Sequence, residues 1–133
     1  MILLDTHVVV WLDQDDPSLG ASCRALVESA MADGDLVVSE ISFWEVKMLV
    51  EKHRLSLDIE VSEWRRDLLA AGVRELPIDG QVGIQAASLG DLHRDPADRI
   101  IVATAQLSHA SLATADKRLL DWQSDLSRID ARA

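Results

Sequence analysis

Cysteine, long apolar runs and basic residues are all scarce in this chain of 133 residues. The single cysteine, Cys23, has no partner for an internal disulfide, and its place among apolar residues at helical spacing predicts a buried, unreactive thiol. No apolar run approaches the roughly 20 residues that span a membrane. The opening Met1–Leu4 is cut off by Asp5 and is too short for a signal peptide, so we expect a cytosolic protein without a membrane partner.

Repeats, low-complexity tracts and domain linkers are also absent from the sequence. A chain of this length most simply forms one domain, here spanning residues 1–133, and buries about two-thirds of the surface that its unfolded form exposes. The fold therefore needs no disulfide to hold it together.

Basic residues are outnumbered, with 13 Lys and Arg against 23 Asp and Glu, which gives a net charge of −10. This balance argues against a nucleic-acid partner, because phosphate binding is normally driven by Lys and Arg. Two other interpretations stay open. Some of the acids can belong to a metal site, where bound cations would reverse the local field, or the acidic surface can be covered by a basic protein partner.

Short apolar runs alternate with amphipathic segments along the chain, which predicts an α/β fold with a central, mostly parallel sheet between layers of helices. The predicted strands are 2–5, 36–39, 73–76 and 111–114, with a weaker one at 126–129. The predicted helices run from Asp16 and Pro17 to just before Gly34, from Ser39 or Ser42 to His53, and over 62–71, 79–87 and 95–107.

Four acidic residues lie where a strand-like run gives way to a helix-like one: Asp5, Glu45, Asp98 and Asp116. In an α/β fold such junctions converge on one edge of the sheet, so these carboxylates should be close in space. Crowded carboxylates repel one another unless a divalent cation neutralises them. Because paired cysteines and clustered histidines are lacking, the sequence predicts a hard cation with oxygen ligands, Mg²⁺ or Mn²⁺.

Each acid also has a structural explanation. Asp5 could cap a following helix, and Asp116 could hold a plain turn. Glu45 fits a capping box with Ser42, although a helix that begins already at Ser39 would leave Glu45 in its second turn, facing inward. Asp95 is the expected cap of the helix that Pro96 opens, which leaves the neighbouring Asp98 free for the metal site.

Several neighbours of the acids are expected to serve a phosphate-bearing substrate. The hydroxyl of Thr6 could position a ligand or a water, and His7 is expected to be structural or to face the substrate rather than to bind metal. Thr114 precedes Asp116, and Lys117 or Arg118 could meet a substrate phosphate. Arg99, beside Asp98, is expected to hold the phosphate backbone of such a substrate. Tryptophan residues at 11, 44, 64 and 122 are expected to be core or interface anchors rather than base-stacking platforms.

The ordered set of motifs resembles PIN-domain ribonucleases, specifically the VapC-like toxins of bacterial toxin–antitoxin pairs. The likeness covers nearly the whole chain and rests on Leu3–His7, Val38–Glu45, His93–Ala103 and Thr114–Asp116. Each motif is weak alone, and the ordered set is specific. The chain departs from the pattern at His53, where relatives often carry glycine in the turn between two helices.

The resemblance implies a PIN-like three-layer α/β/α sandwich and a divalent-metal-dependent endoribonuclease toxin. Asp5, Glu45, Asp98 and Asp116 would bind Mg²⁺ or Mn²⁺, and the Thr114 hydroxyl would support them. It also implies a homodimer, an RNA substrate and a cognate VapB-like antitoxin whose tail blocks the groove.

Functions of other classes fit less well. A receiver domain, which accepts a phosphoryl group on aspartate beside Mg²⁺, would carry adjacent acids after the first strand, and here Thr6 and His7 follow Asp5. An aspartate-nucleophile phosphatase would need a second Asp at position 7. A non-catalytic metal-binding module remains an alternative.

Overall fold

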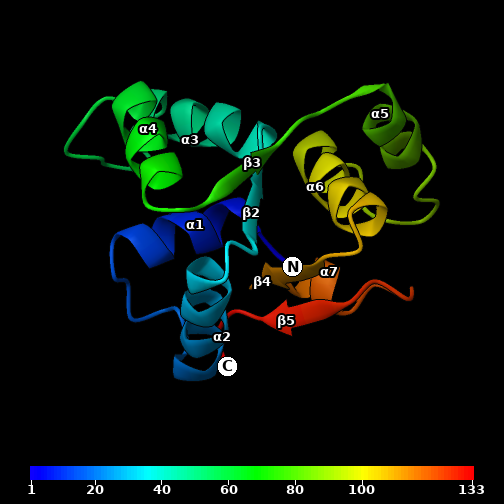
Figure 1. Cartoon of the computed structure of the whole chain (residues 1–133). Coiled ribbons are helices and arrows are strands. Elements are labelled where there is room, and N and C mark those ends of the chain that lie inside the picture. The colour runs from blue at the N-terminus through cyan, green and yellow to red at the C-terminus, as the bar shows by residue number, and fades with distance from the viewer.

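The computed structural model describes all 133 residues, which form a five-stranded sheet with helices on both faces (Figure 1). The strands are β1 (Ile2–Leu4), β2 (Leu36–Ser39), β3 (Arg74–Leu76), β4 (Ser111–Thr114) and β5 (Arg128–Asp130). Their order in the sheet is β3-β2-β1-β4-β5, and every neighbouring pair is parallel. The predicted fold class is therefore confirmed, with a sheet that is parallel throughout.

Seven helices connect the strands. They are α1 (Thr6–Asp13), α2 (Ala21–Ala32), α3 (Ile41–Glu51), α4 (Val61–Ala70), α5 (Gly80–Ala87), α6 (Pro96–Leu107) and α7 (Lys117–Leu120). None of these helices is both long enough and apolar enough to cross a lipid bilayer.

The core lies on both faces of the sheet because successive strand residues point in opposite directions. Leu4 and Val38 face one cluster, which α1, α2, α3 and α4 cover and which contains Cys23, fully buried as predicted. Leu3 and Val37 face the other cluster, to which α6 contributes Ile101. These side chains are completely buried, and each such burial stabilises the fold by about 1.5–3 kcal/mol.

The central strand β1 is the point where the chain changes direction across the sheet. From β1 the chain continues to β2 on one side, and it returns much later to β4 on the other side. The carboxyl ends of β1 and β4 are locked side by side, since the Asp5 N–H donates to the Ala113 carbonyl at 2.9 Å. In open α/β sheets, this switch point is where ligands bind.

The start that was predicted for helix α2, at Asp16 and Pro17, is wrong. The Asp16 Oδ1 accepts a hydrogen bond from the Ser18 N–H at 2.8 Å, which closes a turn, and Gly20 is extended, so that α2 begins only at Ala21. The last strand is also shifted by two residues at its start, to Arg128.

The turn after α3 has the geometry expected of glycine in spite of the sequence departure there. His53 adopts a left-handed backbone with φ of 57°. Because a β-carbon makes this conformation costly, a residue other than glycine strains the turn here.

The amino terminus of α2 is capped by main chain rather than by a side chain. Gly20, its N-cap, offers no side-chain acceptor, and the Ala133 main-chain oxygen accepts from the N–H groups of Ser22 at 3.0 Å and Cys23 at 3.2 Å. Gly20 itself donates to the Ala131 carbonyl at 2.8 Å. A β-carbon at position 20 would lie 2.2 Å from the Ala133 oxygen, so only glycine fits.

Candidate active site

Asp5 stands at the switch point, directly after β1, and only 5% of it is exposed. Its Oδ1 accepts from the Thr6 N–H at 2.8 Å, and its Oδ2 accepts from the Thr114 hydroxyl at 2.7 Å. Burial raises the pKa of Asp5, although both hydrogen bonds act to lower it. Asp5 therefore caps α1 and also presents a buried carboxylate at the sheet edge.

Glu45 reaches the same edge through Thr6. The Thr6 hydroxyl donates to the Glu45 Oε1 at 2.5 Å, so the Ser42 hydroxyl, 2.9 Å away, must donate to Thr6. The capping-box interpretation is wrong because α3 begins at Ile41 and places Ser42 inside the helix, where its backbone is already in the first turn. Glu45 faces inward, and burial raises its pKa to about 7.

Asp95 and Asp98 divide their roles at the start of α6. Asp95 is the N-cap, since its Oδ1 accepts from the N–H groups of Ala97 at 3.0 Å and Asp98 at 3.4 Å. The Asp98 side chain is left free of the helix and is 7% exposed. Its Oδ2 lies 2.7 Å from the His93 Nε2, and burial raises the pKa of Asp98 in spite of this contact.

Asp116 is the N-cap of the short helix α7 and is tied to Arg118. Its Oδ1 accepts from the Arg118 N–H at 2.9 Å, and its Oδ2 lies 2.9 Å from the Arg118 Nη2. Burial acts to raise the pKa of Asp116, but the hydrogen bonds and the charge of Arg118 outweigh it and hold that pKa below its usual range. The same Nη2 is 3.5 Å from the Asp98 Oδ2, so Arg118 bridges two of the acids.

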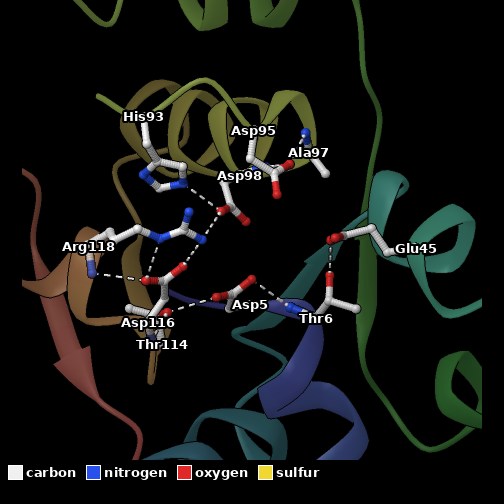
Figure 2. Close-up of polar contacts among 10 residues, drawn as sticks. All are labelled: Asp5, Thr6, Glu45, His93, Asp95, Ala97, Asp98, Thr114, Asp116 and Arg118. Carbon is white, nitrogen blue, oxygen red and sulfur yellow. Dashed lines mark hydrogen bonds and ion pairs between the residues drawn. The ribbon is translucent and has the colours of Figure 1, made fainter. Parts of the chain in front are cut away.

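The four acids gather at one place (Figure 2). Asp5, Asp98 and Asp116 point toward one another, while Glu45 lies to one side and is joined to them through Thr6.

Two of the four acids, together with one histidine, are spaced closely enough to hold a metal ion. Asp98, Asp116 and His93 each offer a ligand atom, and these atoms lie within 4.8 Å of one another. Like charges that are buried together raise carboxyl pKa values, and a cation removes that penalty. The His93 Nδ1 is buried without a hydrogen-bond partner, a further sign that the polar groups here are not fully satisfied within the chain.

The residues that were predicted to bind substrate fall into two groups, one buried beside the acids and one without contact to them. Thr6 and Thr114 are buried and hydrogen-bonded to acids, so they orient carboxylates. Arg99 donates to main-chain carbonyls before α6, and Lys117 forms an exposed ion pair with Asp121. Neither base is hydrogen-bonded or ion-paired to the four acids, and a contact of either with RNA stays a prediction.

One residue at the site, His93, had not been singled out as a site residue from the sequence. His93 precedes the cap of α6 by two residues, and Arg118, which was expected to meet a substrate phosphate, is ion-paired with Asp98 and Asp116 instead. The position of His93 beside the cap of α6 is the one local signal that could have marked it.

A model of the PIN domain matches residues 2–123 of the chain. The chain is 36% identical over 119 residues to Ribonuclease VapC22 of Mycobacterium tuberculosis, covering 89% of this chain and 88% of that protein. Its fold is similar to a toxin–antitoxin complex from Klebsiella pneumoniae, with a TM-score of 0.67, 18% identity and 98% of each chain covered. It is also similar to VapBC2 from Rickettsia felis bound to a promoter DNA fragment, with a TM-score of 0.71, 18% identity, and 97% of this chain and 98% of that chain covered. By the extent of the domain match and the identity to a ribonuclease relative, this chain belongs to the PIN-domain family.

Proposed function

We propose that this chain is a divalent-metal-dependent endoribonuclease and the toxin of a toxin–antitoxin pair. The observation that carries the proposal is the convergence of Asp5, Glu45, Asp98 and Asp116 on one sheet edge, in a chain 36% identical to a protein named Ribonuclease VapC22. Carboxylates so placed suit hydrolysis of a phosphodiester, whose reaction develops negative charge on phosphate oxygens.

Asp5, Asp98 and Asp116, with Glu45 at one side, would hold Mg²⁺ or Mn²⁺. When bound, such an ion supplies a Lewis acid that activates water and neutralises charge on the phosphate. The carboxylates position the ion and are not required to act as bases.

The remaining residues of the site keep these carboxylates in place. The Thr114 hydroxyl holds the Asp5 Oδ2, and it also accepts from the Asp116 N–H at 3.0 Å, so one side chain sets the spacing of two acids. Thr6 holds Glu45 in the same way. Asp95 fixes the first turn of α6 and thereby the direction of Asp98.

The antitoxin partner is supported by the acidity of the chain and by its structural neighbours. A net charge of −10 and a cluster of buried acids favour a basic protein segment at the site. The similar structure from Klebsiella pneumoniae is described as a toxin–antitoxin complex. A homodimer is part of the same proposal.

The test is RNA cleavage by chelator-treated protein to which Mg²⁺, Mn²⁺ or neither is returned. Radiolabelled RNA should be cut only when a divalent ion is present. Equal cleavage in excess chelator would refute metal dependence. Binding of Mn²⁺ without any cleavage would favour the alternative, a non-catalytic or receiver-like metal-binding module.

A further inference from the structure

A cavity adjoins the acid cluster on the side of α1. Asp5 and Asp116 form one wall of a cavity of about 320 Å³ whose other walls come from α1 and from the residues after β5. This volume is near the lower end of the range for small-ligand sites and suits one unit of a polymer. The other lining residues are His7, Trp11, Ala115, Arg118 and Arg132.

Arg132 is the residue that gives this cavity a free positive charge. Its guanidinium carbon lies over the Trp11 ring, 5.1 Å from the ring centroid, and no carboxylate pairs with the guanidinium. Arg118, in contrast, is engaged by Asp116 and Asp98. The exposed His7 adds a hydrogen-bond donor on the opposite element, α1.

Arg132 is held in place although it lies at the end of the described chain. The neighbouring Ala131 is fully buried, and its N–H donates to the Thr114 carbonyl at 2.9 Å. On the other side, the Ala133 oxygen accepts from the start of α2. The Arg132 N–H itself donates to the Asp130 Oδ1 at 2.9 Å. The guanidinium is therefore presented from a fixed backbone and an aromatic platform, so little entropy is lost when it binds a ligand.

We propose that this cavity is a subsite for a backbone phosphate of single-stranded RNA, one position away from the phosphate that is cut. The inference rests on the proposed ribonuclease function and adds the residues that position the substrate. Arg132 would donate its paired N–H groups to two phosphate oxygens, and His7 would donate to the phosphate from the other side. The shared wall of Asp5 and Asp116 places this phosphate next to the acid cluster.

The location also explains how a chain with a net charge of −10 can hold an anionic substrate. Phosphate contacts fix the register of a nucleic acid on a protein, and an unpaired arginine beside the site supplies one such contact without a basic surface elsewhere. Arg132 is accordingly a positioning residue, and it takes no part in the chemical step.

The experiment compares Arg132→Gln with Arg66→Gln in the full chain. Arg66 is an exposed arginine of α4 that lines no part of this cavity, so the control removes the same charge elsewhere. Binding of a fluorescein-labelled, single-stranded RNA of mixed sequence is followed by anisotropy in chelator, where the RNA is not cut. Cleavage in Mn²⁺ gives kcat and KM, and the thermal midpoint of each variant reports its folding.

Arg132→Gln should weaken RNA binding and raise KM by about ten-fold while kcat changes little, because a hydrogen-bonded charge pair is lost. The slope of log affinity against log salt should fall by about 0.7, the value for one phosphate contact on a single strand. Arg66→Gln should change binding and KM less than two-fold, as an exposed and unpaired charge does at moderate salt.

Equal effects of the two variants would overturn the subsite, as would a wild-type chain that binds no RNA. Displacement of the RNA by inorganic phosphate alone, at matched ionic strength, would assign the cavity to a free anion and overturn it too. If Arg132→Gln instead weakens only the binding of a co-purified protein partner and leaves RNA binding unchanged, the cavity is a site for that partner and the RNA subsite is refuted. A wild type that binds RNA through Arg132 but never cuts it would keep the subsite and refute the ribonuclease function.

Discussion

The replacement of Asp98 by Asn separates metal binding from folding more sharply than any other single change. Asn keeps the shape of the side chain and can still accept from the His93 Nε2, 2.7 Å away in the wild type. It removes the charge that a hard cation requires. Asp95→Asn is the matched control three residues earlier in the same helix start, because Asn caps helices about as well as Asp.

The expected stability change without metal is small because two effects oppose each other. Exchanging a charge-assisted hydrogen bond to His93 for a neutral one costs about 1 kcal/mol. Removing one negative charge from the buried cluster offsets part of that cost, because burial and the neighbouring carboxylate of Asp5 raise the pKa of Asp98. Asp98→Asn should therefore unfold within about 1 kcal/mol of the wild type in chelator.

Added Mn²⁺ should reveal the difference. At a hundred times its dissociation constant, an ion that binds only the folded state adds about 2.7 kcal/mol, which is roughly a 10 °C rise in Tm for a domain of this size. The wild type and Asp95→Asn should both show that rise and should cut RNA. Asp98→Asn should show neither.

The assays are thermal unfolding and cleavage of radiolabelled RNA, each with chelator and with Mn²⁺. Near-normal cleavage by Asp98→Asn, or a dead Asp95→Asn beside an active Asp98→Asn, would show that the roles of these two residues have been assigned wrongly. A metal-free Asp98→Asn that fails to fold would contradict the energetic argument.

The remaining predictions test separate parts of the structure. Burial raises the pKa of Glu45 to about 7 in the folded chain, above its unfolded value, so chelated protein should lose about 1–2 kcal/mol between pH 5 and pH 7.5 after allowance for partial exposure. Denaturant unfolding should show that loss reduced in Glu45→Gln, and an unchanged pH profile would disprove it. Gly20→Ala should destabilise the fold by about 1–3 kcal/mol because its β-carbon meets the Ala133 oxygen at 2.2 Å. Gly83→Ala, inside α5 with nothing within 4 Å of the added β-carbon, should stabilise the fold by about 0.5–1 kcal/mol. Unfolding midpoints equal to that of the wild type would contradict both glycine predictions. Antitoxin binding should weaken as salt is raised, measured by titration calorimetry, whereas a salt-independent affinity would exclude a basic segment at the acids.

The sequence predicted the strands and the acids that follow them because both depend on local signals, and the convergence of the acids then followed from the α/β fold class. Asp5 ends an apolar run, and Asp95 precedes a proline, so each position is visible in a few neighbouring residues. The start of α2 could not be predicted in the same way. Asp16 and Pro17 favour a helix locally, but the cap that α2 uses comes from Ala133, more than a hundred residues later in the sequence.

The side-chain contacts of the site depend on tertiary direction rather than on spacing. Arg99 and Arg118 are each within two residues of a site acid, yet only Arg118 turns toward the acids, while Arg99 donates to main-chain carbonyls of α5 and of the loop that follows it. Spacing along the chain cannot distinguish the two. Glu45 was ambiguous for a related reason, because its role depended on whether α3 begins before or after Ser42.

Arg118 also affects whether the chain can fold before it binds metal ions. Its guanidinium lies between Asp98 and Asp116, so these acids have a positive partner before any ion arrives. Folding and metal loading are thereby separable: a newly made chain can reach its native structure where divalent ions are scarce and acquire them afterwards. Each ion must then compete with a resident guanidinium, so the ion concentration at which the chain becomes loaded is governed partly by an arginine that is not among the four acids.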